Sequence, residues 1–343
     1  MTIRWGMQRT NALRPARHVV RPSRWLAVGT LLAALFGFTA FPTTETLEIL
    51  VDGLLRTARI HVPDDAGTAA SYPLVLAFHG SAWNGAIMEE TTGLSDLADR
   101  EQFVVVYPDG TGPSDVRSWN AGFCCSFALE RDVDDLAFVD ALIDRLIADH
   151  SIDPTRVYAT GFSNGGMFAY RLAIERPERF AALAVVAGAM YPSQRPPGAP
   201  MPILVIHGTD DAVVPYVGGW GALRALSGKT EPALGAVEAV RRWIENNGCP
   251  GTPKSVESLR TTRIETYAPC RNGAEVVFIT VLDGTHRWPV IEENRSDFLL
   301  TDDAFDLYAG LTDADEQIPW DLFENGLDAS QVIWEFFEAH DRR

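Results

Sequence analysis

A serine between small residues, Gly161-Phe-Ser-Asn-Gly165, is the feature of this sequence best suited to covalent chemistry. An apolar, β-prone run at residues 157–159 precedes it, and a helical pattern at 167–175 follows it. Strand, tight turn and helix form the context in which G-x-S-x-G becomes a nucleophile elbow. The serine backbone is strained at such a turn, so the residues two positions away on either side must be small. The sequence therefore predicts that Ser163 is a nucleophile.

A nucleophilic serine needs a base, and His207, His286 and His340 are the histidines that follow Ser163. His207 ends an apolar run, which favours a structural role, and His340 lies three residues from the end of the chain. His286 lies in a loop just after the last predicted strand, where an imidazole can reach back over the edge of a sheet. We therefore expect His286 to be the base.

The acid that orients the base is expected between the serine and the histidine, in the loop after the apolar run 203–206. Asp210 and Asp211 are both in that loop, and their position alone does not choose between them. The negative charge that develops on the substrate needs backbone N–H donors. We expect these donors to be Asn164, directly after the nucleophile, and Ser81, in the loop after the first central strand.

The elements that must position these residues follow from the hydrophobic pattern. Alternation at 47–51 and 57–62 around Asp52-Gly53 predicts an antiparallel hairpin. Continuous apolar runs predict buried strands at 74–79, 103–107, 157–159, 182–186, 203–206 and 274–282. Helical spacing occurs at 133–150, 167–175, 236–247 and 329–340. This alternation predicts an α/β fold with a doubly wound, mostly parallel sheet that begins with the N-terminal antiparallel hairpin.

Charge is distributed unevenly along the chain. The 343 residues carry a net charge of −17, and 46% of them are hydrophobic, which is typical of a globular protein. Residues 1–24 hold six arginines and no acid, so the rest of the chain has 23 basic and 46 acidic residues. Such an acidic body argues against nucleic-acid binding. We expect one domain over residues 46–343, with the acidic segment 296–316 as a surface insertion.

The first 45 residues have the pattern of a targeting segment. The basic stretch is followed by an uncharged apolar run at residues 25–41. This pattern predicts a secretory signal peptide, with a mature protein that begins near residue 41. The alternative is an uncleaved N-terminal anchor, although the apolar run is short for a membrane span. We expect a secreted protein, extracellular or periplasmic, that contacts a membrane only if residues 1–45 are retained.

Four cysteines follow the leader, and an even number in an exported chain suggests disulfides. Cys249 and Cys270 flank a polar, loop-rich stretch, and we predict that they pair. Cys124 and Cys125 then remain, as a vicinal disulfide or as free thiols. The cysteines form no C-x-x-C pair and have no adjacent histidine, so no zinc site is expected.

Seven segments resemble one known family, and they occur here in the same order. They are Phe78-His-Gly-Ser81, Trp119-Asn-Ala-Gly-Phe-Cys-Cys125, Val133-Asp-Asp135, Gly161-Phe-Ser-Asn-Gly-Gly-Met167, His207-Gly-Thr-Asp-Asp-Ala-Val-Val-Pro215, Gly284-Thr-His-Arg-Trp-Pro289 and Ala329-Ser-Gln-Val-Ile-Trp-Glu-Phe-Phe337. Together they resemble the polyhydroxybutyrate depolymerase and feruloyl esterase group of secreted α/β-hydrolases. The resemblance covers nearly everything after residue 46 and implies an α/β-hydrolase fold.

The resemblance also implies a catalytic triad of Ser163, Asp211 and His286, because the family pattern H-G-T-x-D places the acid at Asp211. Two positions depart from the family, in which glycine is common at both: Phe123, and Val290 after Trp-Pro. Both are expected near the mouth of the pocket, so they leave the choice of substrate open.

The activity that the resemblance implies is hydrolysis of carboxylic esters through an acyl-enzyme, without a metal or cofactor. The expected partner is an ester substrate, either a polyhydroxyalkanoate polymer or oligomer or a hydroxycinnamoyl (feruloyl) ester of the plant cell wall. Trp83, Trp119 and Trp288 could line a pocket for an aromatic or polymeric acyl group, or they could belong to an aromatic core.

Two other functions use the same fold. A dipeptidyl-type peptidase would apply the triad to amides, and a catalytically silent hydrolase-like protein would only bind. The complete set of serine, aspartate and histidine argues against the silent protein.

Overall fold

The computed structural model describes residues 44–63, 71–114, 116–221, 232–259, 261–290 and 327–342. All of them belong to one compact unit, Phe41–Arg343. The leader (except residues 44 and 45) and the acidic segment 296–316 lie outside the described residues, so the expectations for them stay predictions. The same holds for the assignment of 46–343 to one domain.

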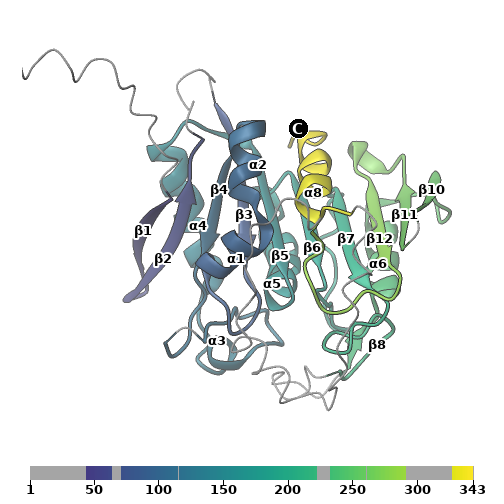
Figure 1. The fold of residues 1–343 in the computed structure, drawn as a ribbon, viewed down its shortest axis with the longest axis horizontal. Helices are drawn as coiled ribbons and strands as arrows, with labels where there is room; N and C mark the ends of the chain where they lie inside the picture. Colours follow the sequence, from purple (N-terminus) through teal and green to yellow (C-terminus); the bar gives the residue numbers. More distant parts are fainter. Residues whose placement is uncertain are drawn as a thin grey trace, which may run out of the picture. The chain divides into compact units, whose positions relative to one another are not determined.

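The described strands form one large sheet in the order β1-β2-β4-β3-β5-β6-β7-β12-β11-β10 (Figure 1). The central strands β4, β3, β5, β6, β7 and β12 are parallel, and the strands outside them are antiparallel. Their bounds are β1 Glu45–Val51, β2 Leu54–His61, β3 Tyr72–Phe78, β4 Val104–Pro108, β5 Ile152–Phe162, β6 Ala182–Val186, β7 Ile203–Gly208, β10 Ser255–Leu259, β11 Thr262–Tyr267 and β12 Val276–Val281. The predicted α/β class and the N-terminal hairpin are confirmed. A small second sheet pairs β8 Gly218–Gly219 with β9 Ala233–Leu234.

The far edge of the sheet differs from the expectation. The stretch between Cys249 and Cys270 was expected to be loop-rich, but it contains the antiparallel hairpin β10–β11. Most side chains of this hairpin are exposed or half-buried, so the strands lack a continuous apolar run. Polar edge strands are one way to discourage pairing with other chains, and their composition resembles that of loops.

Alternate residues of each central strand face two separate cores. In β3, Leu74, Leu76 and Phe78 belong to one core, whereas Val75 and Ala77 belong to the other. The first core is covered by α4 Asp135–Asp149, α5 Asn164–Glu175 and α6 Ala236–Asn247. The second is covered by α1 Gly85–Thr92, α2 Leu94–Glu101 and α8 Ala329–Glu338, which lie in front of the sheet in Figure 1. No helix among the described residues is long and apolar enough to cross a membrane.

Parallel strands bring their carboxyl ends to one edge of the sheet, here called the carboxyl edge. Phe78 at the end of β3 pairs with Gly161 of β5, and Phe162 of β5 pairs with Val186 at the end of β6. Loops that leave this edge are where α/β proteins bind ligands. The loops after β3, β5, β7 and β12 carry the residues singled out from the sequence, namely Ser81, Ser163, Asp211 and His286.

All four cysteines are paired in the structure. Cys249 is bonded to Cys270, as predicted, and Cys124 is bonded to its neighbour Cys125. Cys249 follows Gly248, which ends α6, and Cys270 follows β11. The Cys249–Cys270 disulfide therefore ties the antiparallel edge of the sheet to a helix of the first core.

Candidate active site

Ser163 lies at a sharp turn between β5 and α5. Its backbone has φ 53° and ψ −120°, which is strained for any residue other than glycine. A Cβ at Gly161 would clash with the backbone of Gly165, and a Cβ at Gly165 would clash with the carbonyl of Phe78. A Cβ at Gly166 would lie 3.0 Å from the Gly161 carbonyl oxygen. The glycines thus permit the strand–turn–helix geometry that was predicted for this motif.

The loop after β3 lies against this turn. A Cβ built on Gly80 would be 3.5 Å from the Cβ of Ser163 and 3.1 Å from the ring of Phe162. Ser163 itself is only 1% exposed. The close approach of Gly80 places the next residue, Ser81, in the neighbourhood of the serine.

Asp211 and His286 are in direct contact. The Nδ1 atom of His286 lies 2.7 Å from Oδ2 of buried Asp211. The other oxygen, Oδ1, accepts hydrogen bonds from the backbone N–H groups of Val213 and Val214. Burial alone would raise the pKa of Asp211, but the charge of His286 and hydrogen bonds from His207 and His286 hold it well below its ordinary value. The carboxylate is therefore ionised and can orient the imidazole.

The adjacent aspartate has different contacts. Asp210 is exposed, its backbone N–H donates to the carbonyl of Gly284, and its carboxylate lies 3.4 Å from the hydroxyl of Thr209. The structure therefore places Asp211, and not Asp210, against His286.

The imidazole of His286 also lies close to the elbow. Its ring centroid is 4.9 Å from that of Phe162, the residue before Ser163. Gly208 allows the His286 loop to approach the sheet, because a Cβ there would clash with the Gly284 carbonyl. Loops after β5, β7 and β12 thus bring the serine, the aspartate and the histidine to one place on the carboxyl edge.

The two expected oxyanion donors belong to structured turns. Asn164 is the first residue of α5, where backbone N–H groups have no acceptor within the helix and the helix dipole is positive. In the turn that holds Ser81, the neighbouring N–H groups are engaged: Ala82 donates to the carbonyl of Arg117 and Trp83 to that of Gly80. The backbone N–H groups of Ser81 and Asn164 stay our predictions for the two donors of the oxyanion hole.

His79 and His207 hold loops of the site in place. Gly110 donates its backbone N–H to Nε2 of His79, so Nδ1 carries the proton and donates to the carbonyl of Gly80. Burial lowers the pKa of His79 to about 4, although the bond to Gly80 opposes the shift. His207 Nε2 donates to the carbonyl of Val214, beyond the aspartates. These contacts fit the structural role expected for His207 and give His79 a similar one.

The three tryptophans expected near a pocket are all buried. Trp119 has no exposed surface and stacks on Phe168, whereas Trp288 donates its indole N–H to Ser330. Trp83 is 9% exposed and stacks on Phe162. Of the two alternatives left open for Trp119, Trp83 and Trp288, their burial favours the aromatic core, because each indole packs among neighbouring side chains.

One buried ion pair, between Arg56 and Asp135, was not predicted from the sequence. Arg56 of β2 lies 2.7 Å from Asp135, the first residue of α4, and both are almost fully buried. Burial raises the pKa of Asp135, and the charge of Arg56 opposes that rise. The second oxygen of Asp135 accepts the backbone N–H of Asn120. The pair therefore anchors the loop after β4; its only signal was the motif Val133-Asp-Asp135.

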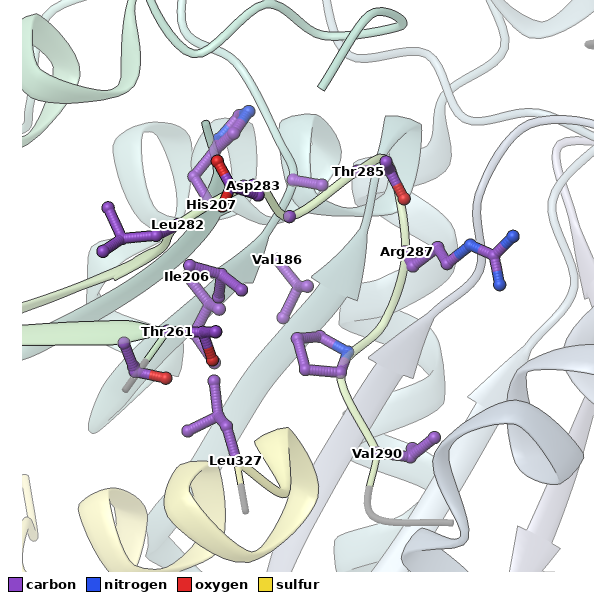
Figure 2. Close-up of a pocket in the computed structure, with 16 residues that line it drawn as sticks. Val186, Ile206, His207, Thr261, Leu282, Asp283, Thr285, Arg287, Val290 and Leu327 are labelled. Atoms are coloured by element: carbon purple, nitrogen blue, oxygen red, sulfur yellow. The ribbon is translucent and has the colours of Figure 1, made fainter. Parts of the chain in front are cut away.

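A cavity of about 70 Å³ is lined in part by residues of the loop that carries His286. Val186 and Ile206 line it from the sheet, and Leu327 points toward it from the segment before α8 (Figure 2). Figure 2 shows the guanidinium of Arg287 directed away from these apolar side chains. Ser163 is not among the residues that line this cavity.

The known proteins that this chain resembles are described as esterases. Residues 58–213 match the family described as "Esterase PHB depolymerase". "Putative esterase NocK" of Nocardia uniformis subsp. tsuyamanensis is 33% identical over 261 residues, which are 72% of this chain and 74% of that protein. "Feruloyl esterase B" of Piromyces equi is 29% identical over 62% of this chain, but the match spans only 39% of that protein.

A solved structure shares the fold. The acetyl xylan esterase from Aspergillus awamori superposes with a TM-score of 0.51 over 78% of this chain and all of that chain, at 15% identity. At this identity the likeness establishes the fold alone.

Proposed function

This chain belongs to the esterase PHB depolymerase family of α/β-hydrolases and is a carboxylic-ester hydrolase, and we propose that it acts through an acyl-enzyme formed on Ser163. The observation that carries the proposal is the 2.7 Å contact between His286 and Asp211 beside the strained turn of Ser163. A base held by an ionised carboxylate is what a neutral serine hydroxyl requires in order to attack an ester.

In the first step, Nε2 of His286 takes the hydroxyl proton as Ser163 Oγ bonds to the ester carbonyl carbon. Asp211 accepts the hydrogen bond from Nδ1, which leaves the lone pair on Nε2 and stabilises the imidazolium that forms. Collapse of the tetrahedral intermediate breaks the bond to the alcohol, and His286 returns the proton to the leaving oxygen. The result is an acyl-serine and a free alcohol.

The N–H groups of Ser81 and Asn164 hold the oxyanion of each tetrahedral intermediate. The position of Asn164 at the start of α5 supports this role, because the helix dipole favours negative charge there. Water then attacks the acyl-serine with His286 as its base. The carboxylic acid leaves and the hydroxyl of Ser163 is regenerated.

The substrates we propose are polyhydroxyalkanoate chains or oligomers and hydroxycinnamoyl (feruloyl) esters of the plant cell wall. The family to which the chain belongs and the feruloyl esterase among its relatives support this choice. A panel of poly(3-hydroxybutyrate), methyl ferulate and acetylated xylan tests it. Turnover of either of the first two in preference to acetylated xylan is expected, and selective deacetylation of xylan would contradict it.

We propose that the protein is exported. The support comes from the basic and apolar pattern of residues 1–41 and from the disulfides of the described part, which persist in oxidising compartments. N-terminal sequencing of the protein recovered outside the cytoplasm should start near residue 41. Recovery of cytoplasmic protein with an intact N-terminus as the main form would contradict export.

The reaction itself is tested with Ser163→Ala and a soluble p-nitrophenyl ester. We expect kcat to fall by several orders of magnitude, with the fold retained, because only the oxyanion hole and binding remain. Aminoacyl-anilides should be poor substrates of the wild type. More than about a tenth of wild-type kcat in the variant would exclude Ser163 as the nucleophile.

A further inference from the structure

We infer that Trp119 is a positioning residue that links the two proposed oxyanion donors, Ser81 and Asn164. The inference rests on the proposed function, because it assigns a role within that mechanism. Of the two roles that the sequence left open for Trp119, its complete burial favours the aromatic core over contact with substrate.

The two donors lie in different elements beyond the reach of the sheet ladder, Ser81 in the loop after β3 and Asn164 at the start of α5. Phe78 of β3 pairs with Gly161 of β5, but Ser81 and Asn164 each come three residues later. Oxyanion stabilisation depends on donors that are already in place when charge develops. The spacing between the donors must therefore be set by contacts outside the ladder.

The first contact of Trp119 is with the loop of Ser81. The indole Nε1 donates to the carbonyl of His79, at 3.0 Å. The next carbonyl, that of Gly80, accepts from Nδ1 of His79 and from the N–H of Trp83. The Gly80 carbonyl and the Ser81 N–H belong to one planar peptide group, so these bonds together set the direction of that N–H.

The second contact is with Asn164. The Oδ1 atom of Asn164 accepts the backbone N–H of Trp119 at 2.8 Å, and its Nδ2 donates to the Trp119 carbonyl at 3.1 Å. Both residues are fully buried. Two hydrogen bonds from one side chain fix its orientation. They also fix the position of the Asn164 Cα, to which the backbone N–H group is bonded. One residue therefore contacts the supports of both donors.

Trp119 can act as a reference because it is itself held firmly. Its ring stacks on Phe168 with centroids 5.0 Å apart, and it meets the ring of Phe78 edge-on. The next residue, Asn120, donates its N–H to Asp135, which forms the buried ion pair with Arg56. The ring contacts and the ion pair thus hold in place the segment around Trp119, which makes both contacts.

The alternative is that Trp119 only fills the core. Trp243 provides a matched control, because it is also fully buried and its indole N–H has no hydrogen-bond partner among the described residues. Trp119→Phe and Trp243→Phe remove the same atoms from the same hydrophobic core. Only the first substitution breaks the link to His79.

The experiment measures kcat and KM of both variants on p-nitrophenyl acetate, butyrate and hexanoate. We expect Trp119→Phe to lower kcat by about tenfold or more, by the same factor for every acyl chain and with KM unchanged, because loss of a whole donor costs 10²–10³. The Ki of a trifluoromethyl ketone, whose adduct with the serine carries an oxyanion, should rise by a similar factor. Trp243→Phe should leave kcat and this Ki unchanged, and it should lose less thermal stability than Trp119→Phe, because only Trp119→Phe removes a buried hydrogen bond.

Equal effects of the two variants on kcat would overturn the inference, and so would a loss that depends on the length of the acyl chain, which indicates a pocket wall. If Trp119→Phe does not fold, benzothienylalanine at position 119 keeps the ring and replaces only the N–H by sulfur, with the same expectations. Ser163→Ala separates the two proposals: an active Ser163→Ala enzyme refutes the mechanism. An inactive one, with Trp119→Phe equal to Trp243→Phe, refutes only the role of Trp119.

Discussion

Nδ1 of His286 lies 2.7 Å from Oδ2 of Asp211, although the two residues are 75 positions apart in the chain. The contact joins the loop after β7 to the loop after β12, which are neighbouring parallel strands. Asp210 precedes this carboxylate directly and lies exposed beside Thr209. Chemically identical neighbours therefore have separate roles, and substitution can tell them apart.

Asp211→Asn should lower kcat by about 10⁴ on a soluble ester, because the amide cannot fix the tautomer of His286 or stabilise its charged form. Asp210→Asn, the matched control, should cost less than about tenfold, as expected for a local turn contact. Circular dichroism confirms that both variants are folded. If Asp210→Asn is the inactive variant and Asp211→Asn is close to wild type, the acid has been assigned to the wrong residue.

Gly165→Ala tests the close approach at the elbow. A methyl group there would meet the backbone carbonyls of Phe78 and His79, so we expect the variant to lose at least about 1–3 kcal/mol of stability and most of its activity. Gly251→Ala is the control, since a Cβ at Gly251 meets no atom within 4 Å. Chemical denaturation and an ester assay measure both effects. Wild-type activity in Gly165→Ala would mean that the turn is looser than the structure shows.

The sequence predicted the centre of the fold better than its periphery. The central strands can be recognised in the sequence as continuous apolar runs, because both of their faces are buried. Helices α1 and α2 were not predicted: each has only eight residues, and α1 shows little separation of apolar and polar faces. The β10–β11 hairpin was missed because most of its side chains are exposed or half-buried, so its strands carry no continuous apolar run.

The candidate site shows the same limit at the level of single residues. Local sequence patterns and the order of elements along the chain predicted three features. They are the elbow serine, the histidine after β12 and the loop that holds the acid. The bond from Trp119 to His79 spans 40 positions, and the Arg56–Asp135 pair spans 79. Such contacts depend on how loops meet in space. Hydrophobic periodicity therefore carries no information about them, and for this reason the sequence left open whether Trp119 lines a pocket or belongs to the core.

Stability should depend on pH through His79. Its folded-state pKa is about 4, below the roughly 6.5 of an unfolded histidine, so the unfolded chain gains a proton first as pH falls. The free energy of unfolding should then decrease by about 2 kcal/mol between pH 6.5 and 5 on account of this group. From about one pH unit above 6.5 the contribution is constant, because the histidine is then almost entirely neutral in both states.

Urea titrations at several pH values test this with His79→Gln, which retains a donor and an acceptor but does not titrate. The variant should show a flatter pH dependence than the wild type in that window. An unchanged slope in His79→Gln would show that His79 takes up its proton in the folded state.

The Cys249–Cys270 disulfide should contribute stability without affecting catalysis. Replacing both cysteines by alanine is expected to lower the free energy of unfolding by roughly 3 kcal/mol, since the bond closes a loop of about 20 residues in the unfolded chain. The bond joins α6 to the antiparallel edge, so kcat should be close to wild type. Free thiols at both positions in native protein, seen by non-reducing peptide mapping, would contradict the pairing.

The most direct measurement identifies the atom that carries the acyl group. Wild-type enzyme is mixed with excess p-nitrophenyl ester, quenched in acid within milliseconds and digested for mass spectrometry, in parallel with a fluorophosphonate-treated sample. We predict that the acyl mass and the phosphonyl mass both reside on the same peptide at Ser163, and that Ser163→Ala shows neither. Stoichiometric acylation of another residue, or rapid ester turnover without any labelling of Ser163, would contradict the nucleophile assigned here.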